Sequence, residues 1–213
     1  MKKSCIISHY CQIRDHAVIG DDETLYERCG ADLSDFFTGI YQHFDISYPK
    51  FYKMDNLCKL GFLSVELLLM DRNIQQRYAG HEVGIILMNA SSSLDNDRHH
   101  QQTILDRSAY FPSPAVFVYT LPNIVIGEIC IRHKFTGEGT FFVRERFDPL
   151  FLFNYVNQLF YQDVVQCCIA GWVETLGDYY DSTVYLIEKT GKPDAGITIF
   201  EPDTIKHIFA KEK

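Results

Sequence analysis

The chain has 213 residues, of which 46% are hydrophobic and 14% aromatic, so it can bury a large core and does not resemble a disordered sequence. Its formal net charge of -8 leaves no basic face for a phosphate backbone, which argues against nucleic-acid binding. The length is typical of one domain, and we expect residues 1–213 to form a single domain.

The cysteines and the apolar segments indicate a cytoplasmic protein without a membrane span. The seven cysteines are an odd number with no paired CxxC spacing, which predicts free thiols in a reducing compartment. The regions 111–131 and 150–173 approach the length of a membrane-spanning helix, but prolines and polar residues interrupt both. We therefore expect both regions to belong to a buried core.

The first half of the chain contains two elements with clear patterns. Residues 3–8 form a short apolar strand, and residues 15–47 are a polar, turn-rich stretch that we interpret as a loop-rich insertion. From Asn56 to about Asp71, apolar residues recur at three- and four-residue spacings, which predicts a buried helix. The continuous apolar run at 83–88 is typical of a central strand covered on both faces.

The second half alternates helices and strands. In chain order the patterns predict a helix at 124–132 capped by Asn123, a turn and strand at 137–143, and a long aromatic helix at 148–162. A buried strand at 164–174 and a hairpin at 183–201, with its turn at 190–194, follow. The alternation predicts an α/β fold with a mixed, mostly parallel sheet and helices packed on it.

A series of short segments carries a family resemblance. Tyr52-Lys53-Met54-Asp55 precedes Gly84-Ile85-Ile86-Leu87, then Tyr119-Thr120-Leu121-Pro122-Asn123, and Ala170-Gly171-Trp172-Val173-Glu174 closes the series. In this order they resemble the N-terminal half of the β-ketoacyl-acyl carrier protein synthases, over roughly residues 1–190. The resemblance implies a thiolase-like half-fold.

The resemblance also implies where chemistry would occur. The family uses a nucleophilic cysteine at a strand-to-helix turn, where the helix N-terminus favours thiolate and oxyanion. The family pattern places Phe147 at the nucleophile's position, and an alignment shifted by one residue gives Arg146 or Asp148. A phenyl ring cannot attack a thioester, and neither Arg146 nor Asp148 is a cysteine. The family's catalytic histidines lie in its C-terminal half, and this chain ends after a segment, 181–188, that resembles the start of that half. We expect no catalytic residue, no cofactor and no metal.

Charged residues replace the small ones that surround the nucleophile in an active synthase: Arg144, Glu145, Arg146 and Asp148. Charges in a buried turn are costly unless they are paired. We expect them to form mutual salt bridges, to be exposed to solvent, or to face a partner protein.

Two other clusters are candidates for chemistry. Ser91–Ser93 follow the predicted strand at 83–88, but no Gly-x-Ser-x-Gly turn exposes a nucleophile, so a capping or loop role is favoured. Asp95, Asp97, His99 and His100 carry ligands that suit zinc or manganese. The two histidines are consecutive and no scaffold is evident, so a solvated loop is the preferred interpretation.

The resemblance predicts a catalytically silent subunit, similar to the short chain length factors of aryl-polyene systems. We expect a homodimer, or a heterodimer with a full-length ketosynthase, in fatty acid, polyene or polyketide-type biosynthesis, with acyl carrier protein as a further partner. One alternative is an acyl-thioester hydrolase or transferase that uses Ser91–Ser93 or the Asp95–His100 cluster. The other is a stand-alone acyl-carrier-binding module, against which the acidic charge of the chain counts.

Overall fold

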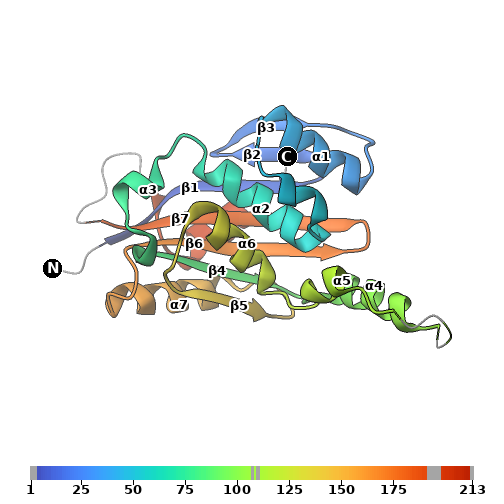
Figure 1. Cartoon of the computed structure of the whole chain (residues 1–213). Coiled ribbons are helices and arrows are strands. Elements are labelled where there is room, and N and C mark those ends of the chain that lie inside the picture. Colours follow the sequence, from blue (N-terminus) through green and yellow to red (C-terminus); the bar gives the residue numbers. More distant parts are fainter. Residues whose placement is uncertain (1–3, 107, 109–110, 191–197, 212–213) are drawn as a thin grey trace.

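One mixed β-sheet organises the chain (Figure 1). The structure, a computed structural model, describes residues 4–106, 108, 111–190 and 198–211. The strand order is β3-β2-β1-β7-β6-β4-β5, and β8 also pairs with β1. The strands are β1 Ser4–Arg14, β2 Ala17–Gly20, β3 Glu23–Glu27, β4 Val83–Asn89, β5 Gly139–Val143, β6 Cys167–Leu176, β7 Tyr179–Thr190 and β8 Thr198–Ile199.

Parallel pairing is confined to the neighbours of β4. In the described part of the chain, β4 runs parallel to β5 and β6, and the other strand pairs are antiparallel. The mixed α/β sheet is confirmed, but the expectation that it is mostly parallel is wrong. Strands buried on both faces read as continuous apolar runs, and such runs are typical of parallel sheets. β6 is such a strand, yet it turns through Gly177 and Asp178 directly into antiparallel β7.

Helices cover both faces of the sheet. The core on one face includes side chains of α1 Leu33–His43, α2 Asn56–Leu69 and α6 Ile124–His133. In Figure 1, α2 and α6 lie in front of the sheet. The core on the other face includes side chains of α7 Pro149–Tyr161 and α8 Pro202–Phe209. The apolar side chains of the sheet are therefore buried on both sides.

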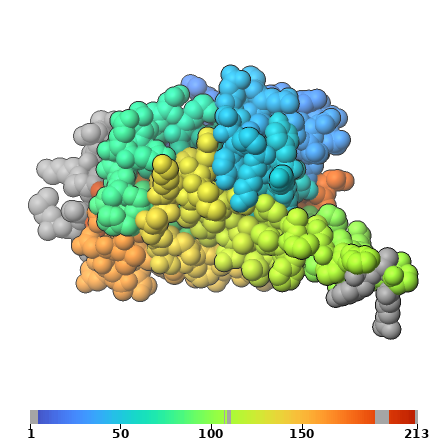
Figure 2. Space-filling view, in the orientation of Figure 1, coloured from blue at the N-terminus to red at the C-terminus, as the bar shows by residue number. Residues whose placement is uncertain are grey.

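A pair of helices projects from the body as an arm (Figures 1 and 2). The arm consists of α4 Leu94–Ile104, α5 Pro114–Val118 and the described residues between them and up to Leu121. It carries a group of large exposed apolar side chains: Leu94, Leu105, Phe111, Phe117, Val118 and Leu121. The remaining short helices are η1 Pro49–Lys53, α3 Ile74–Arg77 and η2 Gly80–Glu82. No helix among the described residues has the length and apolar character needed to cross a membrane.

The strongly patterned elements lie close to where the sequence placed them. The predicted helix from Asn56 is α2, and the apolar run at 83–88 is β4. α2 begins where expected because the Asp55 side chain accepts a hydrogen bond from the Cys58 amide at 2.9 Å. Asn123 precedes α6, but its side chain makes no capping hydrogen bond.

The stretch at 15–47 is ordered into strands and a helix, so its interpretation as a loop-rich insertion is wrong. It contains β2, β3 and α1. Asp15 and His16, and likewise Asp21 and Asp22, have positive φ angles and form the two tight turns that link β1, β2 and β3. Such turns are usually marked by glycine or asparagine. In these two turns aspartate and histidine occupy the central positions, so the sequence pattern did not indicate a hairpin.

The predicted C-terminal hairpin is also wrong. Residues 183–188 lie within β7, whose hairpin partner is β6. β8 pairs with β1, through Ile6 and Ile199, rather than with β7. The predicted turn at 190–194 lies mostly outside the described residues.

Side chains of the sheet hold the C-terminal end of α8. Gln12 donates to the carbonyl of Ile208 at 3.0 Å, and Arg14 donates to the carbonyl of Phe209 at 2.9 Å. The last carbonyls of a helix have no partner within the helix, so these bonds satisfy groups that would otherwise need water. α8 is therefore fixed against β1 and β7, next to the end of the sheet described below.

The close approach of β6 and β7 at Gly171 is a testable requirement of the fold. A Cβ atom on Gly171 would overlap the carbonyl oxygen of Thr183, which is backbone and has little room to move. We expect Gly171→Ala to lower the free energy of unfolding by roughly 1–3 kcal/mol in urea denaturation. Gly127→Ala is the matched control, because nothing lies within 4 Å of the Cβ position of residue 127. Residue 127 lies inside α6, and a helix interior favours alanine over glycine. A Gly171→Ala protein as stable as the control would contradict this packing.

Candidate functional site

Phe147 lies in the turn that joins strand β5 to helix α7. Asp148, the next residue, caps α7, and its side chain accepts a hydrogen bond from the Phe151 amide at 3.0 Å. The Phe147 ring is half-buried and packs against three aromatic rings. Its centroid lies 4.2 Å from that of Phe209, 6.1 Å from that of Trp172 and 6.5 Å from that of Tyr185. A phenyl ring embedded in this way fills space and supports α8.

The charged residues of the same turn are partly paired. Arg144 and Asp148 form an ion pair of 2.7 Å, and the Arg144 guanidinium lies over the Phe151 ring, 4.3 Å from its centroid. The Arg144 amide donates to the carbonyl of Asn89 at 2.8 Å, which ties the turn to β4. Glu145 and Arg146 are exposed. Both mutual pairing and solvent exposure therefore occur, as the sequence predicted.

A cavity of about 470 Å³ opens beside Phe147. It lies where β4 and β6 end and where β7 begins, and four aromatic residues line it: Phe147, Trp172, Tyr179 and Phe209. Ser91 and Leu176 also line it, as do three acidic residues and one basic residue: Glu145, Glu174, Asp181 and Arg146. The volume falls in the range of small-molecule sites, roughly 300–1,000 Å³.

Two carboxylates stand opposite each other in this cavity. Glu174 of β6 and Asp181 of β7 are directly paired residues of the antiparallel hairpin, so their side chains share one face of the sheet. Asp181 forms an ion pair with Arg14 at 2.9 Å. Burial raises the pKa of the Asp181 carboxyl above its ordinary value, Arg14 opposes that rise, and Asp15 and Glu174 add to it.

Glu174 is held by the turn that follows β4. One of its oxygens, Oε2, accepts hydrogen bonds from the amides of Ala90 at 2.5 Å and Ser91 at 3.2 Å. The other oxygen, Oε1, is buried and has no hydrogen-bond partner among the described residues. The carboxylate is thus fixed in position and only half satisfied.

The three serines after β4 point to different places. Ser91 lines the cavity beside Phe147, while Ser92 and Ser93 line a second cavity of about 460 Å³ at the base of the arm. The Ser93 hydroxyl donates to the carbonyl of Thr120 at 2.7 Å. No histidine is among the described residues that line the cavity of Ser91, so the base that a serine nucleophile needs is not beside it.

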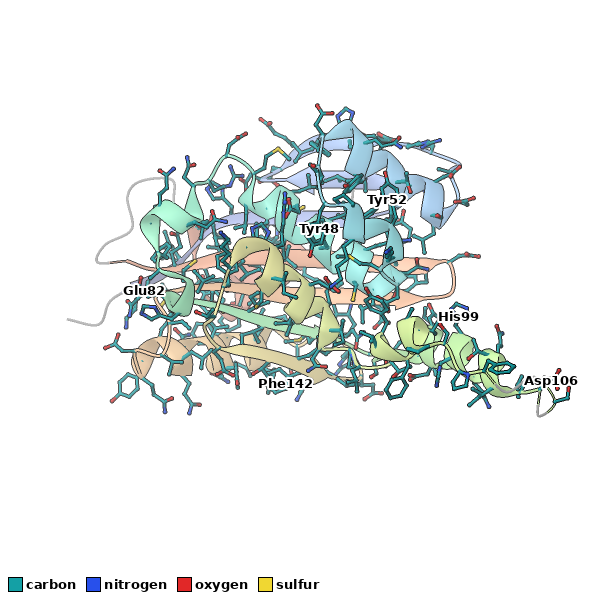
Figure 3. All side chains as sticks on the ribbon, viewed as in Figure 1. Tyr48, Tyr52, Glu82, His99, Asp106 and Phe142 are labelled. Atoms are coloured by element: carbon teal, nitrogen blue, oxygen red, sulfur yellow. The ribbon has the colours of Figure 1, made fainter. Side chains whose placement is uncertain are left out.

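The Asp95–His100 stretch is helical, so its interpretation as a solvated loop is wrong. It lies in α4, where Figure 3 labels His99. Asp95 and His99 are four residues apart on this helix, and both line the second cavity. Asp95 accepts a hydrogen bond from the Gly177 amide at 2.8 Å. His100 packs against Phe117 with ring centroids 5.4 Å apart, and Asp97 lies near the Ser93 hydroxyl. In the described part of the chain, no three His, Cys, Asp or Glu residues group closely enough to hold a metal ion.

The sequence located the turn around Phe147 but missed the carboxylate pair and the role of α8. Glu174 appeared only as the end of a family-like segment, and Asp181 only as the start of another. Their pairing follows from the two-residue turn at Gly177 and Asp178, which sets the register of β6 against β7. A two-residue hairpin turn predicted at Gly177 and Asp178 would have placed Glu174 opposite Asp181.

Comparisons with known proteins agree with this fold. No protein-family model matches the chain, and no curated protein matches it in sequence. Among solved structures, the ishigamide ketosynthase/chain length factor superposes with a TM-score of 0.67 at 15% identity, covering 90% of this chain and 63% of that one. A type II PKS ketosynthase solved with its acyl-carrier protein gives 0.60 at 13% identity, with 88% and 62% covered.

A ketosynthase in complex with its chain length factor, from Xenorhabdus doucetiae, gives a TM-score of 0.50 at 10% identity, covering 88% of this chain and 80% of that one. At these identities the likeness establishes the fold, and the thiolase-like α/β prediction is confirmed. The chain spans less than two thirds of the length of the first two structures.

Phe147 can be tested as a packing residue. We expect Phe147→Ala to lower the free energy of unfolding by roughly 1–2 kcal/mol, less than for a fully buried phenylalanine because the ring is only half-buried. Urea denaturation measures the change. Phe111→Ala is the matched control, since that ring is 83% exposed, and it should change stability by less than about 0.5 kcal/mol. Equal effects of the two substitutions would argue against a packing role.

Proposed function

We propose that the chain is a catalytically silent, ketosynthase-like subunit that pairs with an active β-ketoacyl synthase, as a chain length factor does. The observation that carries the proposal is Phe147, which occupies the strand-to-helix turn between β5 and α7 where the family resemblance expects a nucleophilic cysteine. Two of the structures with the same fold are described as a ketosynthase with a chain length factor. The biosynthesis served would be of the fatty acid, polyene or polyketide type, in the cytoplasm.

The surroundings of Phe147 support the proposed lack of catalytic activity. No cysteine and no histidine is among the described residues that line its cavity, and its neighbours Arg146 and Asp148 are not cysteines. The hydrolase alternative has Ser92, Ser93 and His99 on one cavity in its favour, whereas Ser91 lines another. The Ser93 hydroxyl is already bonded to the carbonyl of Thr120, and no hydrogen bond joins His99 to either serine among the described residues. The acyl-carrier-binding alternative has two pairs of basic residues in its favour, Lys50 with Lys53 and Arg144 with Arg146. Lys50 is already paired with Glu128, and Arg144 with Asp148.

Strand β5 offers a surface for such a partner. It is the last strand of the sheet and pairs on one side with β4. The Ile85 amide donates to the carbonyl of Glu138, and the Arg144 amide donates to the carbonyl of Asn89. These two hydrogen bonds join the β4 and β5 segments. Because bonding alternates along a strand, the amides of Phe141 and Val143 face away from β4. Val143 is 54% exposed, and an open edge of this kind accepts another strand.

Co-purification tests the proposal. The tagged chain, expressed together with each ketosynthase of its source genome, should retain one of them in a 1:1 complex measured by size exclusion with light scattering. A homodimer without any ketosynthase would favour the homodimer alternative. A stable monomer that retains no ketosynthase and no acyl carrier protein would contradict the proposal.

The edge of β5 can be tested with one pair of variants. Val143→Pro removes an outward-facing amide and leaves the pairing with β4 intact, so the protein should fold but lose its partner. Val143→Thr keeps both the amide and the branched shape and should bind as the unmodified chain does. A complex that survives Val143→Pro would show that partner binding does not use this edge.

The proposed lack of catalytic activity can be tested by placing a thiol at position 147. We expect Phe147→Cys to show no condensing activity with acyl and malonyl carrier protein, because the cavity lining supplies no histidine to accept or donate a proton. The assay follows consumption of the carrier-bound substrates, with Phe147→Ala as the control. Condensation by Phe147→Cys above that control would contradict the proposed loss of the catalytic site.

A further inference from the structure

Glu174 differs from the other deeply buried glutamates of this chain. Among the described residues, three glutamates are at most 4% exposed: Glu128, Glu174 and Glu188. Glu128 forms an ion pair with Lys50 at 2.7 Å, and Glu188 forms one with Arg77. Glu174 has no Lys, Arg or His within ion-pair distance in the described part of the chain, and its Oε1 has no partner at all. A buried carboxylate is costly without a cation, so the missing partner calls for an explanation.

The position of Glu174 supplies one. Trp172, Glu174 and Leu176 alternate along β6, so their side chains share one face, and all three line the 470 Å³ cavity. Glu128 also has one buried oxygen, Oε2, without a hydrogen-bond partner among the described residues, but Lys50 neutralises its charge. Glu174, the buried glutamate without a cation, is the one that faces an open space. Glu128 and Glu188 line none of the cavities described above.

The rest of the cavity suits a positive charge on an apolar body. Asp181 stands opposite Glu174 and pairs with Arg14, and Glu145 is a third carboxylate of the lining, so carboxylates outnumber the basic side chain that lines the cavity among the described residues. Four aromatic rings line the walls, and aromatic faces attract cations. Arg146 is the one basic residue of the lining, and it is exposed to solvent.

We propose that this cavity binds a small organic amine, with a primary ammonium bonded to Glu174 Oε1 and an alkyl or aryl body against Trp172 and Phe147. A primary ammonium supplies the N–H donors that Oε1 lacks, and it neutralises the buried charge. A carboxylate or phosphate at the same place would be repelled by Glu174 and Asp181. The site therefore prefers a cation, whereas a fatty-acid site must accept an anion. The inference does not depend on pairing with a ketosynthase.

A ligand series of constant shape tests the inference on the full, unmodified chain. Trp172 is the single tryptophan of the sequence and lines the cavity, so its fluorescence reports binding directly. Titration at pH 7 with n-octylamine should give saturable binding at least about tenfold tighter than with n-octanol, since a hydrogen bond between charged groups adds that much. Octanoate should not bind. Equal affinity for the amine and the alcohol, or tighter binding of octanoate, would overturn the proposal.

Glu174→Gln identifies the group responsible. The glutamine keeps the size of the side chain and an oxygen for the Ala90 and Ser91 amides but loses the charge. The variant should lose at least about tenfold in octylamine affinity, while octanol affinity stays unchanged. Glu23→Gln, an exposed position on β3, is the matched control and should bind octylamine normally. Retained octylamine binding in a folded Glu174→Gln protein would also refute the proposal, whereas loss of ketosynthase binding would not bear on it.

Discussion

The pairing of β6 with both of its neighbours is the constraint on which the rest of the structure depends. β6 runs parallel to β4 on one side and antiparallel to β7 on the other, so it joins the two differently paired parts of the sheet. Gly171, in the middle of β6, lets the backbone of Thr183 come close. This fixed register determines which side chains of β6 face α7 and α8, and thereby places Trp172 and Glu174 in the cavity.

The sequence was informative wherever burial left a long and uniform pattern. α2 and β4 were found because each is buried over most of its length, and α7 because its apolar and aromatic residues form one continuous helical segment. Turns made without glycine were missed, as at Asp15 and His16, and with them the first hairpins of the sheet. The hydrophobic run of β6 revealed burial but not direction, because antiparallel strands covered on both faces give the same run.

The candidate site was predictable only where it is local in sequence. The turn from β5 to α7 could be located from its own residues, and with it Phe147. The carboxylate pair could not, because Glu174 and Asp181 meet only after the hairpin sets its register. Phe209 contacts Phe147 from α8, which reaches this position through bonds from Gln12 and Arg14 near the other end of the sequence. Contacts that join such distant residues leave no periodic signal.

The turn at Phe147 also differs from an acyl-transfer site in its electrostatics. A helix N-terminus stabilises a thiolate or an oxyanion through backbone amides that have no partner within the helix. At the start of α7, the Asp148 carboxylate already bonds the Phe151 amide and pairs with Arg144. A negative side chain at that point repels the anion that the chemistry would create. Substitution of Phe147 alone would therefore leave a turn in which the Asp148 carboxylate still occupies the N-terminus of α7.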